Sequence, residues 1–416
     1  MKGIFVILDG LGDLSNNILE NKTPLEAAET PNLDFLASRG EMGFMYPVKP
    51  GYIPESDEAI LSIFGNDLIS SSSRGQLEAV GTGLKLMRGD LALRVNFGTI
   101  DSLDRGNIID RRAGRTLTTA EAEVLVKGIN NRVKLPMKFE LKASIQHRAV
   151  LVLRGGFSDN ISLNDSHYSQ GRINLKDKIS ICKALDDEDN TQYTAEVLND
   201  FIRQAYDILN VHPINMERRK KGLMPANFIL IRGPGIENPK LKSYKKWISV
   251  AYMPLEIGFS KLSGMKVYTF DYPKMKDLDA YLNLYEGLRQ ACEFSIKIIN
   301  KYHTKADYMY IHIKETDMPG HDNKPLEKKK MIEYVDKTLF NFLRQFAPPN
   351  KIKVVVTGDH STPCRLKEHS ADPVPVLFYN GNIPREKIHF SEKEARLGKL
   401  GRIEGKELLK KVGFVR

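Results

Sequence analysis

Residues 3–10 read Gly-Ile-Phe-Val-Ile-Leu-Asp-Gly, so a short apolar run passes directly into an acidic residue. This pattern predicts a buried strand over Gly3–Leu8, with Asp9 just beyond its carboxyl end. Far along the chain, a helical pattern over Asp277–Tyr302 precedes a second apolar run at Tyr308–Ile313. Strands that alternate with helices in this way are typical of βα units and a mostly parallel sheet.

Outward from these runs the sequence predicts more elements of the same kind. A helix is expected to begin at Pro31, with Thr30 as its N-cap, and Gly40 fits its end. The remaining expected elements are helices at Asp57–Phe64 and Leu326–Phe346, strands at Ile352–Val356 and Pro375–Tyr379, and a small basic helix from Ile403.

The middle of the chain has a different pattern, with hairpins and mixed strands. Strands are expected at Leu91–Ile100, Gln146–Leu153 and Asn227–Ile231, and a helix at Tyr193–Leu209. We therefore expect an α/β domain that is split in sequence, residues 1–88 and 242–416, with a smaller α+β domain inserted at 89–241.

Composition excludes several classes of protein. The 416 residues are 41% hydrophobic and 27% charged, which is ordinary for a globular chain and unlike disordered or collagen-like sequences. No apolar run approaches the ~18 residues of a membrane span, and the first residues are interpreted as a strand rather than a signal peptide. Cys182, Cys292 and Cys364 are far apart and are expected to be reduced thiols of a cytoplasmic protein.

The formal net charge of +10 fits an anionic partner, either a small anionic substrate, nucleic acid or an anionic membrane. The basic clusters Arg218–Lys221 and Lys328–Lys330 are interpreted as solvated surfaces, and neither is interleaved with aromatic residues. Nucleic-acid binding and membrane binding are therefore not expected.

Four separated segments place acidic, imidazole or hydroxyl groups just after an apolar run or at the start of a helix. Because ligands bind beyond the carboxyl ends of parallel strands, these groups can converge. Carboxylates and imidazoles together suit zinc, manganese or similar divalent ions, so the sequence predicts a two-metal site. Each residue alone also has an ordinary explanation, such as a turn at Asp9 or a loop at Pro319-Gly320. The segments contain Asp9, Ser56, Asp317, His321, Asp359, His360 and His369.

Ser56 and the arginines of the middle segment complete the candidate site. Ser56 precedes an apolar helix, so it is a good N-cap, and a metal-bound serine there could also attack phosphorus. Arginine forks match carboxylate and phosphate groups, although a surface salt bridge is the usual role of a single arginine. The arginines concerned are Arg94, Arg111, Arg112, Arg115, Arg148, Arg154 and Arg232.

These residues lie in motifs that resemble the archaeal-type, cofactor-independent phosphoglycerate mutases of the alkaline phosphatase superfamily, over almost the whole chain. The motifs are Asp9-Gly10, Lys22–Ala28, Thr30–Asn32, Ser56-Asp57, Arg74-Gly75, Asp110–Arg115, His147-Arg148, Pro225–Asn227, His312–His321, Thr357–Pro363, Asp372–Pro375 and Gly398–Ile403. The resemblance implies an alkaline-phosphatase-like, mostly parallel sheet flanked by helices.

The resemblance also implies roles. One metal would be held by Asp9, Ser56, Asp359 and His360, the other by Asp317, His321 and His369, and Ser56 would be transiently phosphorylated. The implied substrate-binding positions are Arg94, Arg111, Arg115, Arg148, Arg232, Lys246, Asp165 and His167. Asp165 and His167 are also candidates for the acid/base group. The chain departs from the family pattern at Glu55, at Trp247–Ser249, and at Leu163 and Ser166.

The expected reaction is the interconversion of 3-phosphoglycerate and 2-phosphoglycerate, in glycolysis and gluconeogenesis. It would need two divalent ions (Mn, Mg, Co or Zn), but no 2,3-bisphosphoglycerate, and a homo-oligomer is compatible with the sequence. The alternatives are a metal-dependent phosphatase or phosphodiesterase, another phosphomutase, a basic nucleic-acid-binding module, or a structural protein. The last leaves the converging motifs unexplained.

Overall fold

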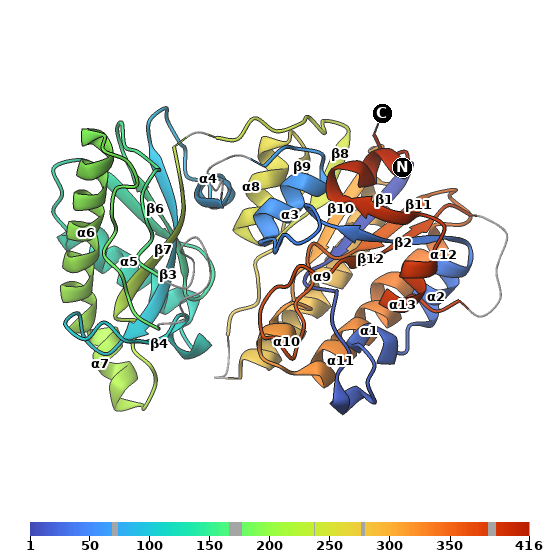
Figure 1. The fold of residues 1–416 in the computed structure, drawn as a ribbon, viewed down its shortest axis with the longest axis horizontal. Helices are drawn as coiled ribbons and strands as arrows, with labels where there is room; N and C mark the ends of the chain where they lie inside the picture. The colour runs from blue at the N-terminus through green and yellow to red at the C-terminus, as the bar shows by residue number, and fades with distance from the viewer. Residues whose placement is uncertain (69–73, 166–176, 237, 276–278, 382–387, 416) are drawn as a thin grey trace.

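Two sheets organise the chain, and each forms the centre of one lobe (Figure 1). The computed structural model describes all residues except 69–73, 166–176, 237, 276–278, 382–387 and 416. We call the part built on the eight-stranded sheet the large lobe and the part built on the five-stranded sheet the small lobe. Within the described residues, no helix is both long and apolar enough to cross a membrane.

The large sheet is mostly parallel, as predicted. Its central strand β1 (Gly3–Leu8) lies between β10 (Tyr308–Ile313) and β11 (Lys353–Thr357), and both neighbours run parallel to it. The order of strands is β13-β2-β12-β11-β1-β10-β8-β9, and β12 runs antiparallel to β11 and to β2. The other strands are β2 (Gly40–Tyr46), β8 (Trp247–Val250), β9 (Lys266–Tyr268), β12 (Val374–Tyr379) and β13 (Gly401–Glu404).

Helices cover both faces of this sheet, which is why β1 is apolar throughout. Ile4, Val6 and Leu8 belong to the core cluster on one face, whereas Phe5 and Ile7 belong to the cluster on the other. The helices of the large lobe are α1 (Pro24–Ala27), α2 (Pro31–Ser38), α3 (Ser56–Ile63), α8 (Pro254–Leu262), α9 (Ala280–Tyr302), α10 (Met318–His321), α11 (Pro325–Val335), α12 (Asn341–Phe346), α13 (Glu392–Leu397) and α14 (Leu408–Lys411).

The small lobe is antiparallel, and its strands all come from the middle of the chain. Along β3 (Leu91–Ile100), Leu93 and Val95 belong to the core beneath the helices, whereas Arg94 alternates with them and lines the cavity between the lobes. The other elements are β4 (Ile108–Asp110), β5 (Phe139–Ala143), β6 (Arg148–Leu153), β7 (Phe228–Gly235), α5 (Thr119–Arg132), α6 (Asp189–Asn210) and α7 (Pro213–Lys220).

A single helix, α4 (Arg74–Gly81), lies between the lobes and packs on both β3 and α8 (Figure 1). Its contact with α8 is very close, because a Cβ atom on Gly258 of α8 would lie 1.7 Å from the carbonyl oxygen of Leu77. The lobes are therefore joined tightly at this end of the molecule.

Three predicted elements differ from the structure. Gly40, which was expected to end the helix that begins at Pro31, is instead the first residue of β2. The helix expected from Ile403 begins within β13, a strand that pairs with β2. The predicted helix Leu326–Phe346 contains a π-helical turn at Asp336–Phe340. This turn places the buried Asp336 carboxylate where it accepts hydrogen bonds from the amides of Asn32 (3.2 Å) and Leu33 (2.8 Å) at the start of α2.

The predicted N-cap of α2, Thr30, is confirmed, but its side chain does not supply the capping hydrogen bond. Thr30 is the N-cap residue, but its hydroxyl caps no amide and donates to Asp34 instead, at 3.3 Å. Asp336 supplies the missing acceptor from a distant helix, which no local pattern reveals.

Candidate active site

The site lies at the carboxyl-terminal edge of the large sheet, where its three central strands end side by side. Ile7 of β1 pairs with His312 of β10 on one side and with Thr357 of β11 on the other. The residues that follow, Asp9 and Asp359, are thereby brought together, and the amide of Gly10 donates to Asp359 Oδ1 at 3.0 Å.

Gly10 is required by the closeness of this convergence. Its φ is +61°, and a Cβ atom there would lie 2.6 Å from Asp317 Oδ1 and 2.7 Å from Thr362 Oγ1. No side chain fits in that space, so a glycine is needed here for the loops of the site to come together. A turn, which is the ordinary explanation of Asp9-Gly10, does not account for this requirement.

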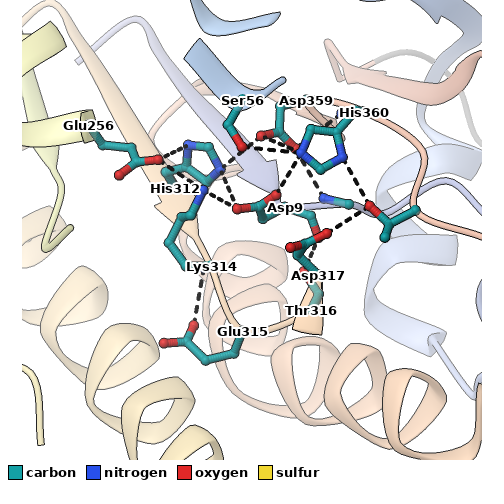
Figure 2. Close-up of polar contacts among 12 residues, drawn as sticks. Asp9, Ser56, Glu256, His312, Lys314, Glu315, Thr316, Asp317, Asp359 and His360 are labelled. Atoms are coloured by element: carbon teal, nitrogen blue, oxygen red, sulfur yellow. Dashed lines mark hydrogen bonds and ion pairs between the residues drawn. The ribbon is translucent and has the colours of Figure 1, made fainter. Parts of the chain in front are cut away.

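Two groups of three side chains present ligand atoms that lie within 4.8 Å of one another. His360 belongs to one group and approaches the other, because its Nε2 lies 3.2 Å from Asp9 Oδ1 and 3.4 Å from Asp359 Oδ2 (Figure 2). The first group is Asp9, His312 and Asp359, and the second is Asp317, His360 and His369. Of the predicted metal ligands, His321 lies beside the second group, with Nε2 3.2 Å from Asp317 Oδ2.

The imidazoles are oriented by hydrogen bonds on their Nδ1 atoms. Nδ1 of His369 lies 2.9 Å from the carbonyl of Pro54, and Nδ1 of His321 lies 3.0 Å from that of Lys367. The Thr362 hydroxyl donates to Asp317 at 2.7 Å, so it accepts from Nδ1 of His360 at 3.0 Å. A protonated Nδ1 leaves Nε2 as the free acceptor, which is the arrangement found in metal-ligating histidines.

The buried charges of this cluster fit a divalent cation. Asp9 Oδ1, Asp359 Oδ2 and His312 Nε2 are buried and have no hydrogen-bond partner among the residues that the structure describes. Burial, together with the neighbouring Asp9 charge, raises the pKa of Asp359 to about 7. Burial alone would lower the pKa of His360, but the carboxylates of Asp359 and Asp9 raise it to about 9. Such groups need a counter-charge, and oxygen and nitrogen donors in this mixture suit a transition metal.

Ser56 is the first residue of α3 and faces this cluster. Glu55, not Ser56, is the N-cap residue, so the interpretation of Ser56 as a helix cap is wrong. The Ser56 hydroxyl lies 3.2 Å from Nε2 of His360, and the side chain is buried at the positive end of the helix. Glu55, which departs from the family pattern, has its carboxylate 3.4 Å from Arg74.

The segment of Asp317 and His321 is a short helix, α10, rather than the loop that Pro319-Gly320 suggested. Proline is tolerated in a first helical turn, and the helix places Asp317 and His321 on one side, four residues apart. The i,i+4 spacing of Asp317 and His321 therefore predicted the local structure correctly, whereas the Pro319-Gly320 pair did not.

Two charged residues at the site were not singled out from the sequence. The Lys314 ammonium contacts the carboxylate of Asp9 and lies 2.9 Å from Glu256 Oε1 (Figure 2). Lys314 follows β10 at the same edge as Asp317, so its position after a strand was an available signal. Glu256 lies in the first turn of α8 and is buried, and nothing in the sequence around it indicated a role.

Arginines of the small lobe face the acidic cluster across a cavity of about 460 Å³. Arg94, Arg111, Arg115, Arg148 and Arg232 all line this cavity, together with Arg74 and Arg112. The first five were expected from the sequence to be substrate-binding residues. Arg74 appeared there only as part of a motif, and Arg112 was given no role. Arg154 is not among the lining residues, and it pairs with Asp90 at 2.5 Å.

The carboxylates behind these arginines set their positions. Asp165 is fully buried and lies 3.1 Å from Arg111 Nε and 3.7 Å from Arg232 Nη2. Glu78 of α4 similarly lies 3.1 Å from Arg74 and 3.4 Å from Arg94. His167 lies outside the described residues.

Lys246 is not brought to the site. Its side chain is 84% exposed and lies 3.9 Å from Asp307. Lys246 immediately precedes β8 and Asp307 precedes β10, and these two strands run parallel. The lysine is therefore at the amino-terminal edge of the sheet, opposite the cavity.

The two basic clusters that were interpreted as solvated each contain one buried cation. Lys328 of α11 is fully buried, and its ammonium donates to Asp13 Oδ2 (2.8 Å), to the carbonyl of Thr362 (3.0 Å) and to that of Gly12 (3.3 Å). It thereby joins the loop after β1 to the loop after β11, which carry Asp9 and Asp359.

Arg218 of α7 is the corresponding residue of the small lobe. Only 2% of it is exposed, and its guanidinium donates to the hydroxyl of Thr116 at 2.7 Å and to the carbonyl of Ala113 at 3.3 Å. These acceptors lie in the turn that carries Arg112 and Arg115.

The fold and the site define an α/β protein in which buried carboxylates and imidazoles at a parallel sheet edge face an arginine-lined cavity. A family model described as 2,3-bisphosphoglycerate-independent phosphoglycerate mutase matches residues 37–215. Proteins of that name from Pyrococcus furiosus and Methanopyrus kandleri are 40% and 35% identical, over 98% of this chain and 95% and 94% of theirs.

Two solved structures resemble the whole chain. A Pyrococcus horikoshii protein is 30% identical with a TM-score of 0.75, and the match covers 100% of this chain and 98% of that one. A cofactor-independent phosphoglycerate mutase from Thermoplasma acidophilum is also 30% identical, with a TM-score of 0.58 and coverage of 100% and 99%. The chain belongs to the family of 2,3-bisphosphoglycerate-independent phosphoglycerate mutases. The resemblance found in the sequence is thus confirmed.

Proposed function

We propose that the chain interconverts 3-phosphoglycerate and 2-phosphoglycerate through a phosphoserine at Ser56, without 2,3-bisphosphoglycerate. The observation that carries this proposal is the position of the Ser56 hydroxyl. It lies 3.2 Å from His360, within the acidic and imidazole cluster, and lines the same cavity as the arginines. The named relatives support the choice of substrate.

Two divalent ions are part of the proposal. Asp9, Ser56, Asp359 and His360 would hold one, and Asp317, His321 and His369 the other. This is supported by Asp9 Oδ1 and Asp359 Oδ2, which are buried and have no hydrogen-bond partner among the described residues. His312 is a further candidate ligand, since it groups with Asp9 and Asp359. When bound, the ions neutralise phosphoryl charge and lower the pKa of the serine hydroxyl.

The residues of the chain then act in sequence. Ser56 Oγ gives up its proton and attacks phosphorus, the bond from phosphorus to the glycerate oxygen breaks, and that oxygen takes up a proton. Arginines of the small lobe hold the glycerate carboxylate while the molecule reorients. The other glycerate hydroxyl then gives up its proton and attacks the phosphoserine, the bond from phosphorus to Ser56 Oγ breaks, and Ser56 regains its proton.

Among the substrate-binding positions, we propose Arg94, Arg111, Arg148 and Arg232 as direct contacts, because all four line the cavity. Arg115 also lines the cavity, but its guanidinium is paired with Asp322 of the large lobe. Asp165 is better suited to positioning than to proton transfer, since its carboxylate pairs with two of these arginines. We further propose that residues 1–88 with 242–416, and residues 89–241, act as two domains that exclude water when they lie together.

A coupled assay on metal-stripped protein tests this function. Mn²⁺, Mg²⁺, Co²⁺ or Zn²⁺ is added back singly with 3-phosphoglycerate, and both 2-phosphoglycerate and free phosphate are measured in the same tube. We expect metal-dependent isomerisation with little phosphate release. Phosphate release without isomerisation would instead identify a hydrolase.

Ser56→Ala is the matching variant. Removing a nucleophile costs roughly 10⁴–10⁶-fold in kcat. Ser62→Ala is its control, because Ser62 is a buried serine of the same helix. Isomerisation that survives in Ser56→Ala at the level of Ser62→Ala would refute the phosphoserine, and metal binding measured on both variants shows whether the site itself is intact.

A further inference from the structure

We propose that the ion pair between Arg115 and Asp322 is a latch that joins the two lobes beside the cavity and determines how much phosphoserine is lost to water. This role rests on the proposed mutase function. Asp322 is the latch residue of the large lobe, and Tyr281 supports it.

The contact connects the two walls of the cavity. Arg115 ends a turn of the small lobe, whereas Asp322 directly follows His321 at the end of α10. Arg115 Nη1 lies 2.5 Å from the Asp322 carboxylate, to which the Tyr281 hydroxyl also donates at 2.9 Å. The Lys324 ammonium lies 3.7 Å from the centre of the Tyr281 ring, which holds that side chain in place. The arginine and the carboxylate are 25% and 19% exposed, so water screens the pair only in part.

The backbone on both sides of the pair is held in an unfavourable conformation. Ala113, Gly114 and Arg115 have φ values of +48°, +67° and +57°, and Asn323, next to Asp322, has +52°. This left-handed region is strained for non-glycine residues such as Ala113 and Arg115, and they keep it only where their surroundings impose it.

Two groups impose the turn of the small lobe, the half-buried carboxylate of Asp110 and the buried guanidinium of Arg218. The Asp110 carboxylate accepts from the amides of Arg112 (2.7 Å) and Gly114 (2.8 Å), and Arg218 binds the carbonyl of Ala113 and the hydroxyl of Thr116. The turn therefore directs Arg115 at the large lobe before any substrate is present.

The position of the pair allows it to limit movement of one lobe relative to the other. The lobes are packed tightly where α4 meets α8 (Figure 1). Arg115 and Asp322 make a second contact between the lobes, at the end of α10. Arg115, Asp110 and Leu255 of α8 all line the cavity, so it extends between these two contacts. A movement of the lobes about α4 would open the cavity at Arg115.

The chemistry makes such an opening costly for a mutase. While Ser56 carries the phosphoryl group, a water oxygen that reaches phosphorus would form a new P–O bond. The bond from phosphorus to Ser56 Oγ would then break, the oxygen would regain a proton, and free phosphate would leave. A latch that keeps the lobes together favours return of the phosphoryl group to glycerate.

Asp322→Ala tests the latch in the metal-loaded enzyme, with 3-phosphoglycerate as substrate. The measured quantity is free phosphate released per 2-phosphoglycerate formed. We expect this ratio to rise about fivefold, the change that corresponds to the ~1 kcal/mol of a partly exposed pair. Tyr281→Phe, which removes only the supporting hydroxyl, should raise it by less.

Asp307→Ala is the matched control. Asp307 is also a partly exposed carboxylate between cations, 3.8 Å from Lys2 and 3.9 Å from Lys246, but it lies at the opposite edge of the sheet. Its ratio should equal that of the wild type. Equal ratios in Asp322→Ala and Asp307→Ala would overturn the latch, and so would a loss of Mn²⁺ affinity in Asp322→Ala that accounts for the change.

Small-angle X-ray scattering separates this inference from the proposed function. The radius of gyration of Asp322→Ala should exceed that of the wild type and of Asp307→Ala, and identical values would overturn the latch. If the wild type forms no 2-phosphoglycerate, the proposed function fails, whereas the scattering still decides whether the pair holds the lobes together.

Discussion

The two walls of the cavity are positioned by different kinds of interaction. On the large-lobe wall, Asp9, Asp317 and Asp359 follow neighbouring parallel strands, so the backbone of the sheet fixes where they lie. On the small-lobe wall, arginines are held by buried carboxylates such as Asp165 and Glu78. The first wall depends on topology and the second on pairs of side chains, so the walls should respond to different substitutions.

A buried cation lies behind each wall. Substituting these two residues tests whether the walls respond independently. Lys328 joins two loops of the large-lobe wall, and Arg218 holds a turn of the small-lobe wall.

Lys328→Met is expected to have the largest effect. The substitution leaves the Asp13 carboxylate buried, without its ammonium partner, and breaking a buried pair in this way costs ~3–5 kcal/mol. Urea unfolding in the presence of a chelator measures this loss. A titration with Mn²⁺ should also show weaker metal binding, because the loops that carry Asp9 and Asp359 are no longer joined.

Lys330→Met is the control for this variant, since Lys330 is exposed and pairs only at the surface, 3.1 Å from Glu327. If the free energy of unfolding of Lys328→Met lies within ~0.5 kcal/mol of that of Lys330→Met, Lys328 does not hold the two loops together.

Arg218→Met should have the next largest effect, about 2–3 kcal/mol, because it leaves the carbonyls of Ala113 and Met224 without their donors. Unlike the lysine variant, it should raise KM for 3-phosphoglycerate while Mn²⁺ affinity stays unchanged. Steady-state kinetics and a metal titration check this, with the exposed neighbour Arg219→Met as control. Weakened metal binding in Arg218→Met would contradict the independence of the two walls.

The smallest effect concerns Glu392 of α13, which supports the large lobe away from the cavity. Its carboxylate accepts from the hydroxyl of Thr23 at 2.7 Å and from the amide of Asp13 at 3.3 Å, and burial raises its pKa to about 7. The folded chain therefore binds this proton more tightly than the unfolded chain, whose carboxyl titrates at the ordinary value of 4.5.

Stability should consequently fall as the pH rises from about 4.5 to 7 and stay level above that range. Glu392→Gln retains an acceptor but has no charge, so its Tm should change less between pH 5 and pH 8. At pH 8 it should be more stable than the wild type by on the order of 1 kcal/mol. An unchanged pH profile in thermal unfolding would refute this assignment.

The difference between the walls also explains what the sequence could predict. Apolar runs followed by acidic residues are local patterns, so the strands β1, β10 and β11 and their carboxylates were found with nearly correct bounds. The pairing of β2 with β12 and β13 depends on residues far apart in the chain, and neither β2 nor β13 was predicted.

At the site, the errors came from side chains whose surroundings lie elsewhere in the sequence. Lys246 was expected to bind substrate because of motif resemblance alone, and a motif does not reveal which edge of a sheet a residue occupies. Arg218 and Lys328 lie in runs of cations, and a run of cations looks solvated unless the buried carboxylate or carbonyls that meet one member are known. Ser56 differs from these because its helix start was visible, although its neighbour Glu55 provides the cap.

The central position of β1 has a consequence for synthesis on the ribosome. Gly3 pairs with Tyr308 and Lys353, and the ring of Phe414 covers it so closely that a Cβ atom there would lie 2.4 Å from the ring. At about 5–20 residues per second, β1 waits roughly 18–70 s for β11 to be made. The small-lobe strands, which lie between residues 91 and 235, are all complete by then. The nascent chain therefore exposes this apolar strand while the whole small lobe is being made, which makes it an expected client of cotranslational chaperones.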